Sequence, residues 1–200
     1  MTTVWRNAGE KRKETKMNEQ KYRAKMRFYH PNMKGTGCAL SLELIPASGS
    51  DEGCIMACFA NQLTIGSLQT ATPTYSTFDW ENAITVKLDF SDLSRILQVL
   101  RGECESIEDG RGIYHRSAKA GTKINIRHLI DPVQGYAFEV NRVKNGGGAE
   151  SRAMIMLYNW EALGLMEAIA GSMSLICFGV ARENASASAA KKTRSADEAA

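Results

Sequence analysis

The order of apolar and polar positions predicts four strands and then a short helix in the first half of the chain. Runs in which apolar and polar residues alternate are typical of strands with one buried face. Four such runs lie at Lys21–His30, Cys38–Ile45, Cys54–Ile65 and Ile84–Phe90. Apolar residues then recur at helical spacing from 93 to 100, with Ser91 as the expected helix cap and Gly102 as the expected stop.

The second half repeats this order of elements. Further strand-like runs lie at Ile113–Arg116, Thr122–Ile130, Tyr136–Lys144 and Arg152–Tyr158, and a long helix follows. Short sequence echoes in the same order support a duplication, since a Tyr-His pair precedes a Gly-Thr pair in each half. The pattern predicts an α+β fold of two ββββα units, at about 21–102 and 110–179.

The long helix is predicted from Asn159 to Gly179. Asn159 is suited to cap its start, and Glu161 lies in the first turn, where the helix dipole favours an acid. Gly179 fits the residue of positive φ that often ends a helix. A helix this apolar is not half exposed in a soluble monomer, so it belongs in a core, a membrane or an oligomer. We expect an oligomer interface on one helical face, formed by Leu165, Met166, Ile169, Met173 and Ile176.

A membrane span is the less favoured of these interpretations. The stretch from Leu163 to Val180 reaches only about the minimum spanning length, and Glu167 places a costly carboxylate near its middle. Small residues interrupt the stretch, and it has no aromatic belt. The sequence therefore favours a helix buried in the subunit or between subunits, with no membrane partner.

Composition and charge limit the domain organisation. Hydrophobic residues make up 44% of the 200 positions, enough for a core, and a net charge of +3 does not by itself indicate a nucleic-acid partner. Residues 1–20 are rich in lysine and arginine and lack apolar periodicity, which predicts a disordered basic arm. Residues 181–200 are predicted to be a second disordered tail. The folded domain is expected at 21–180.

The candidate chemistry argues against an enzyme. Five cysteines without a secretory segment indicate reduced thiols in an intracellular protein, in the cytoplasm or the nucleoid. Acidic residues in the first twenty positions count against an organelle transit peptide, although an organelle location stays open. No catalytic motif and no metal-ligand spacing is present, so we expect no cofactor and no metal site.

Several motifs, taken in order, resemble the Whirly family of single-stranded-DNA-binding proteins. The run from Lys34 to Leu40 stands where that family has its Lys-Gly-Lys-Ala-Ala-Leu motif, with one extra residue and without the second lysine. Phe78-Asp79-Trp80, Tyr114-His115, Gly135-Tyr136-Ala137-Phe138 and the terminal Phe178-Gly179 are similar to other family patterns. The resemblance spans about Lys25 to Gly179. It implies two antiparallel four-stranded sheets, each crossed by a helix, with the helices joining four subunits into a homotetramer.

The resemblance also implies a largely sequence-independent single-stranded-DNA-binding function. Such binding requires cations for phosphates and flat side chains for bases. The candidate residues are Lys25, Arg27, Tyr29 and Lys34 in the first half, and Tyr114, Arg116, Lys119, Lys123, Arg127, Tyr136, Arg142 and Lys144 in the second. Two other functions stay open: an RNA-binding protein of the same fold, and a structural oligomer without nucleic acid.

Some of these side chains have simpler interpretations. Exposed lysines and arginines on strands often serve only solubility. Phe28, Phe59, Phe90 and Phe138 are candidates for the core, Phe90 most of all, and Trp80 is expected to pack at a strand entry rather than to bind a base.

Overall fold

The computed structural model describes residues 24–67, 72–131 and 134–180. The first half contains β1 (Lys25–His30), β2 (Cys38–Ile45), β3 (Cys54–Thr64), β4 (Thr77–Phe78), β5 (Ile84–Leu88) and α2 (Phe90–Leu100). The second half contains the 3-10 turn η1 (Ile107–Gly110), β6 (Ile113–Arg116), β7 (Ala120–Leu129), β8 (Gly135–Lys144), β9 (Glu150–Leu157) and α3 (Asn159–Phe178). The predicted arm 1–20 and tail 181–200 lie outside the described residues.

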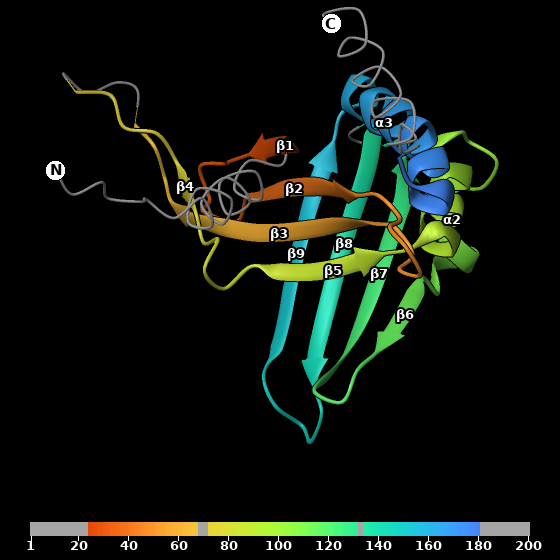
Figure 1. The fold of residues 1–200 in the computed structure, drawn as a ribbon. Helices are drawn as coiled ribbons and strands as arrows, with labels where there is room; N and C mark the ends of the chain where they lie inside the picture. Colours follow the sequence, from red (N-terminus) through yellow and green to blue (C-terminus); the bar gives the residue numbers. More distant parts are fainter. Residues whose placement is uncertain (1–23, 68–71, 132–133, 181–200) are drawn as a thin grey trace, which may run out of the picture.

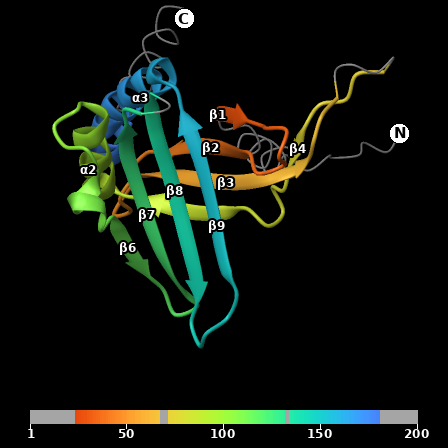
Figure 2. The same ribbon diagram turned by 180° about the vertical axis from the view of Figure 1, so that it is seen from behind.

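The strands form two antiparallel sheets (Figure 1). In the first sheet β1, β2, β3 and β5 are neighbours in that order, and the short β4 pairs with the far end of β3. In the second sheet the order is β6, β7, β8, β9. Seen from the front and from behind, the strands of one sheet cross those of the other (Figures 1 and 2). The predicted α+β class and the two sheets are confirmed; only β4 and η1 were not predicted.

The core lies between the two crossed sheets. Phe59 of β3 and Phe138 of β8 are each 1% exposed, and their rings meet edge to face at 5.1 Å between centroids. Phe28 is buried as well. These three phenylalanines therefore belong to the core. The expectation for Phe90 is wrong: it is 51% exposed, because the buried alternation of β5 ends at Leu88 and Phe90 opens the helix on its outer side.

The start of α2 differs from the prediction by two residues. Asp89, rather than Ser91, is the N-cap. Its carboxylate accepts a hydrogen bond from the backbone N–H of Asp92 at 3.0 Å, and the Asp92 carboxylate accepts one from the N–H of Asp89 at 3.2 Å. This reciprocal capping box satisfies two backbone donors. One face of the helix then buries its leucines, isoleucine and valine against the core.

Helix α3 is anchored at both ends. Its N-cap is Tyr158 rather than the predicted Asn159, and the Glu161 carboxylate accepts the Tyr158 N–H at 2.9 Å. At the other end, the carbonyl of Ile176 accepts the N–H of Gly53, from the loop between β2 and β3, at 3.1 Å. Gly179 has φ 71°, and a Cβ there would lie 2.3 Å from a carbonyl oxygen of the same loop, so glycine is required.

The predicted oligomer face of α3 is wrong for three of its five residues. Leu165, Ile169 and Ile176 are at most 3% exposed within the subunit, because they pack on the sheets. Met166 and Met173 are half-buried against the same core. The opposite face of the helix stays open, and its large apolar side chains are Trp160 (71% exposed), Leu163 (57%) and Phe178 (87%). The sequence pattern found the apolar helix but chose the wrong side of it as the exposed one.

Among the described residues, α3 is also the one helix that is long and apolar enough to cross a membrane. Length and composition alone support this, and the core helix of a soluble protein passes the same test.

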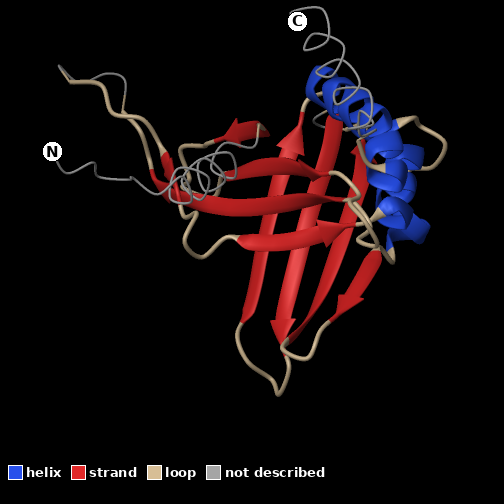
Figure 3. Cartoon of the chain, in the orientation of Figure 1, coloured by secondary structure: helices blue, strands red, loops and turns tan. Residues whose placement is uncertain are grey.

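Helices α2 and α3 lie together at one side of the molecule, as the cartoon shows (Figure 3).

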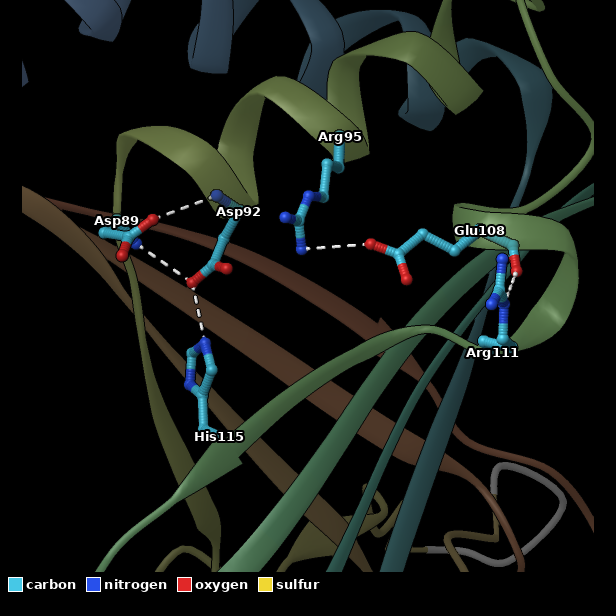
Figure 4. Close-up of polar contacts among 6 residues, drawn as sticks. All are labelled: Asp89, Asp92, Arg95, Glu108, Arg111 and His115. Carbon is cyan, nitrogen blue, oxygen red and sulfur yellow. Dashed lines mark hydrogen bonds and ion pairs between the residues drawn. The ribbon is translucent and has the colours of Figure 1, made fainter.

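Two histidine–carboxylate contacts tie the halves together in a reciprocal way. His30 of β1 in the first half meets Glu161 of α3 in the second half, with Nε2 2.9 Å from Oε2. His115 of β6 in the second half meets Asp92 of α2 in the first half, with Nε2 2.8 Å from Oδ2 (Figure 4). Each acid also caps its helix. The first strand of each half therefore holds the helix start of the other half.

Candidate nucleic-acid interface

The outer face of the first sheet carries three of the predicted residues. Phe28 of β1 pairs in register with Leu40 and lies in the core. Successive side chains of a strand point to opposite faces, so the residues directly before and after Phe28 face outward. Lys25, Arg27 and Tyr29 are accordingly exposed. The Lys25 ammonium lies 3.1 Å from a carboxylate oxygen of Glu43 on β2, so an acid already compensates its charge.

Tyr29 stands in an aromatic cluster with Phe78 and Trp80. Its ring centroid is 5.6 Å from that of Phe78 and 6.4 Å from that of Trp80, and Tyr29 itself is 51% exposed. Trp80 was expected to pack at a strand entry; its ring does pack edge to face with Tyr29, and it is also 39% exposed. The cluster is one exposed aromatic surface at the end of β1. The sequence showed the Phe78-Asp79-Trp80 motif, but only the fold shows that this motif lies next to Tyr29.

Lys34 lies in the turn between β1 and β2, apart from the sheet faces. The Asn32 carboxamide oxygen accepts the backbone N–H groups of Lys34 at 3.0 Å and Thr36 at 3.1 Å, which holds the turn in a fixed shape. The Lys34 side chain is exposed at this turn. The motif that resembles the Whirly lysine run therefore forms a rigid turn that presents a single lysine.

The outer face of the second sheet holds Tyr114, Lys123 and Arg127, all exposed. Tyr114 of the edge strand β6 pairs in register with Lys123 of β7, so an aromatic ring and a cation stand side by side. The ring leans toward Gly121, where a Cβ would lie only 2.2 Å from the Tyr114 hydroxyl. Gly121 therefore makes room for this ring. Tyr114 is 65% exposed and has no aromatic contact among the described residues.

The structure contradicts the prediction that Tyr136 binds nucleic acid. Its ring is 9% exposed and stacks on His128 of β7 at 4.8 Å between centroids, and its hydroxyl donates to the carbonyl of Leu100 at 3.4 Å. Position 136 faces inward because it lies two residues before the core residue Phe138 on the same strand. Tyr136 fixes the end of α2 on the second sheet and offers no surface to a base.

Arg142 and Lys144 lie four and six residues after Phe138 on β8, an even number of positions, so their side chains share its face. They therefore lie on the inner side of the second sheet rather than on its outer face. There the sheets diverge and leave an open cleft of about 520 Å³ between β5 and the ends of β6, β7 and β8. The predicted residues Arg116 and Lys119 line the same cleft, together with Lys87. The sequence analysis did not name Lys87 as a candidate. It could have been found because it holds an exposed position in the alternating pattern of β5.

Other titratable groups belong to the framework. Burial raises the pKa of the Cys38 thiol to about 12, which makes it an inert part of the core. In the part of the chain that the structure describes, no cluster of three histidine, cysteine or acidic side chains is arranged to hold a metal ion.

Comparison with solved structures assigns the fold. WHY1 from Arabidopsis thaliana matches with a TM-score of 0.63 and 15% identity over 86% of this chain and 93% of that one. The plant transcriptional regulator PBF-2 matches at 0.60 and 17%, over 78% and 83% of the two chains. A guide-RNA-binding protein complex bound to a guide RNA matches at 0.50 and 12%, over 78% and 94%.

The chain therefore has the Whirly-like fold, as the sequence motifs implied. No protein-family model matches the sequence, and no curated protein matches it.

Proposed function

We propose that this protein binds single-stranded DNA, largely without regard to sequence. The observation that carries the proposal is the placement of Tyr29 and Tyr114. Each stands exposed on the outer face of a sheet, with Arg27 beside the first and Lys123 beside the second. An exposed ring accepts a base by stacking, and a neighbouring cation neutralises the adjoining phosphate, which is the combination that single-strand binding requires.

The proposal includes assembly into a homotetramer through the exposed face of α3. Trp160, Leu163 and Phe178 recur on that face at helical spacing, and Gly164 and Gly171 lie between them. Exposed large apolar side chains mark an interaction surface, and small residues between them let a second helix approach closely, although Glu167 also lies on this face. A second copy of the same helix supplies both kinds of residue.

RNA is the second candidate ligand. The observation that favours it is the structural similarity to a guide-RNA-binding protein complex. Stacking on exposed rings does not distinguish the two polymers, since bases in both present flat faces. Only contacts with the 2′-hydroxyl would do so.

One pair of measurements tests the proposal. We expect the light-scattering mass of the purified protein to be about four times the 22.0 kDa of one chain, and to rise further with a poly-thymidine oligonucleotide. Fluorescence anisotropy with DNA and RNA oligonucleotides of matched sequence then decides between the polymers. A clear preference for RNA would replace the DNA proposal, and flat curves for both at low salt would leave a structural oligomer.

A further inference from the structure

The cleft between the two sheets is a cationic site distinct from their outer faces. Lys87 of β5, Arg116 of β6 and Lys119 of the following turn line it, and Arg142 and Lys144 of β8 complete it. No carboxylate is among the residues that line it. Five positive charges around one concavity focus a strong field for an anion.

Arg142 is held in a fixed position in this cleft. Its Nε donates to the hydroxyl of Thr122 on β7 at 3.0 Å, and its Nη2 donates to the backbone carbonyl of Thr85 on β5 at 2.6 Å. The side chain thus bridges the two sheets. Both acceptors are neutral, so the positive charge of the guanidinium stays uncompensated while its geometry is set, and a planar guanidinium suits a phosphate.

Lys119 and Lys144 also come from a fixed backbone. The side-chain carboxamide of Asn145 donates to the carbonyls of Ser117 at 3.1 Å and Ala118 at 2.9 Å. The backbone N–H of Asn145 donates to the carbonyl of Lys119 at 2.9 Å. These bonds fasten the turn between β6 and β7 to the end of β8. The two lysines therefore stand close together at the mouth of the cleft with their backbone positions set in advance.

The charges in the cleft are available to a ligand. Within the described ranges, none of the five cations forms an ion pair with a carboxylate. His115 also lines the cleft, and its Nε2 lies 2.8 Å from a carboxylate oxygen of Asp92. Asp92 itself does not line the cleft, so its carboxylate pairs with His115 and not with the cleft cations. An anion that enters the cleft gains charge-assisted hydrogen bonds without displacing an existing ion pair.

We propose that this cleft is a phosphate-binding site that holds the backbone of a strand as it passes over the edge strand β6. Tyr114 and Arg116 both lie on the exposed face of β6, and Arg116, at the end of the strand, also lines the cleft, so a base and its neighbouring phosphates reach both. The strand in this proposal rests on the function proposed above. A free polyphosphate has the same anionic chemistry and is the other source of phosphate.

The test removes two charges at the mouth of the cleft. Lys119 and Lys144 are exposed, so the double variant K119Q/K144Q retains the fold. Its control, R95Q/R101Q, also removes two charges, one on α2 and one at its C-cap, and neither residue lines the cleft; Arg95 differs from the cleft lysines in that Glu108 pairs with it at 3.3 Å. Binding of a poly-thymidine oligonucleotide is measured over a salt series, and binding of inorganic pyrophosphate is measured by calorimetry.

The expected result is a salt slope that falls by about 1.4 in the cleft variant, since each phosphate contact with a single strand contributes about 0.7. With equal affinities at about 1 M salt, this difference weakens binding about 25-fold at about 0.1 M. The control should keep the slope of the unmodified protein.

Each other outcome overturns part of the proposal. An unchanged slope, with pyrophosphate bound by the unmodified protein and lost in the cleft variant, would assign the cleft to a free polyphosphate and not to the strand. An unchanged slope without pyrophosphate binding would overturn the site altogether, while the outer faces could still bind DNA. If the unmodified protein binds no oligonucleotide, the proposed function fails and the pyrophosphate titration alone decides the cleft.

Discussion

Helices α2 and α3 close equivalent halves of the chain, but the subunit covers very different shares of their apolar surface. Helix α2 buries its leucines, isoleucine and valine and turns Ser91 and Gln98 toward solvent. Helix α3 buries one apolar face on the sheets and leaves a second, with Trp160 and Phe178, uncovered. The same order of elements therefore gives two different helices: α2 is completed by the subunit, whereas α3 keeps an apolar face that the subunit does not cover.

The two sheets differ in a comparable way. Tyr29 in the first sheet has two aromatic neighbours, and the nearby Lys25 is paired with an acid. Tyr114 in the second sheet stands without another ring, and Lys123 beside it has no ion pair among the described residues. The first face is therefore supported by contacts within the subunit, whereas the ring and the charge of the second face stand without such contacts among the described residues.

The largest expected effect concerns the two helices. Leu163→Asp places an unpaired charge on the exposed apolar face of α3, where a partner helix would bury it, so we expect the assembly to fall to single chains of 22.0 kDa. The matched control is Gln98→Asp on the solvent side of α2, which should leave the mass unchanged. Sedimentation measures both. An unchanged mass for the α3 variant would mean that this face joins no copies.

Ile169→Asp should behave differently from Leu163→Asp, because Ile169 is 2% exposed inside the subunit. An unpaired charge there destabilises the fold itself. Loss of the cooperative unfolding transition, and not only of assembly, is the expected result.

The second effect compares the two histidine–carboxylate contacts. His30→Ala leaves Glu161, whose side chain is 8% exposed, without its imidazole partner, and we expect a loss of about 3 kcal/mol in the free energy of unfolding. His115→Ala should cost less, about 2 kcal/mol, because the His115 side chain is itself 33% exposed and water screens the pair. Urea unfolding of both variants measures the order. Equal losses would show that burial of the histidine does not set the strength of the contact.

The His115 variant should also show a distinct pH dependence. Burial raises the pKa of Asp92 above its ordinary value of 3.8, and the charge of His115 opposes that rise. A carboxyl group with a raised folded pKa contributes its stabilisation below its unfolded pKa and loses it as the pH rises through the folded pKa. Without His115 the folded pKa rises further, so the deficit of the variant should shrink as the pH falls toward 3.8. A deficit that grows on acidification would contradict this account.

A smaller effect separates the two tyrosines. Tyr114→Ala should weaken binding of a poly-thymidine oligonucleotide by about 1 to 3 kcal/mol, the range for one stacked base. Tyr29→Ala should lose about 1 kcal/mol or less, since Phe78 and Trp80 still offer rings to the same base. Fluorescence anisotropy measures both, and Tyr→Phe at each position is the control that keeps the ring. A larger loss at Tyr29 would show that the aromatic cluster acts as one platform.

Local patterns predicted the elements well because alternation and helical spacing are properties of neighbouring residues. Strands β2 and β6 begin and end where the pattern placed them, and the motifs identified the fold. The caps of both helices were misplaced by one or two residues. Asp89 competes with Ser91 as the cap of α2, and only the bond from the Asp92 N–H decides between them.

The site was harder to predict because it depends on which face of each element is buried. Tyr136 and Arg142 share a strand with Lys144, yet alternation relative to Phe138 turns all three inward. The first then lies under α2 and the other two line the cleft. Helix α3 has apolar residues on both sides, so its spacing alone could not indicate which side meets the sheets. Only the long-range packing of the sheets decides these orientations.

The smallest expected effect tests whether a paired and an unpaired lysine contribute differently to binding. Lys123→Gln should lower the salt slope of oligonucleotide binding by about 0.7, the value for one phosphate contact with a single strand. Lys25→Gln should lower it by less, because Glu43 lies 3.1 Å from that ammonium and a phosphate would have to compete with it. Exposed ion pairs contribute little to stability, so both variants should unfold within about 0.5 kcal/mol of the unmodified protein. Equal slopes for the two variants would mean that a bound strand displaces Glu43, and the first sheet would then contribute as much charge to binding as the second.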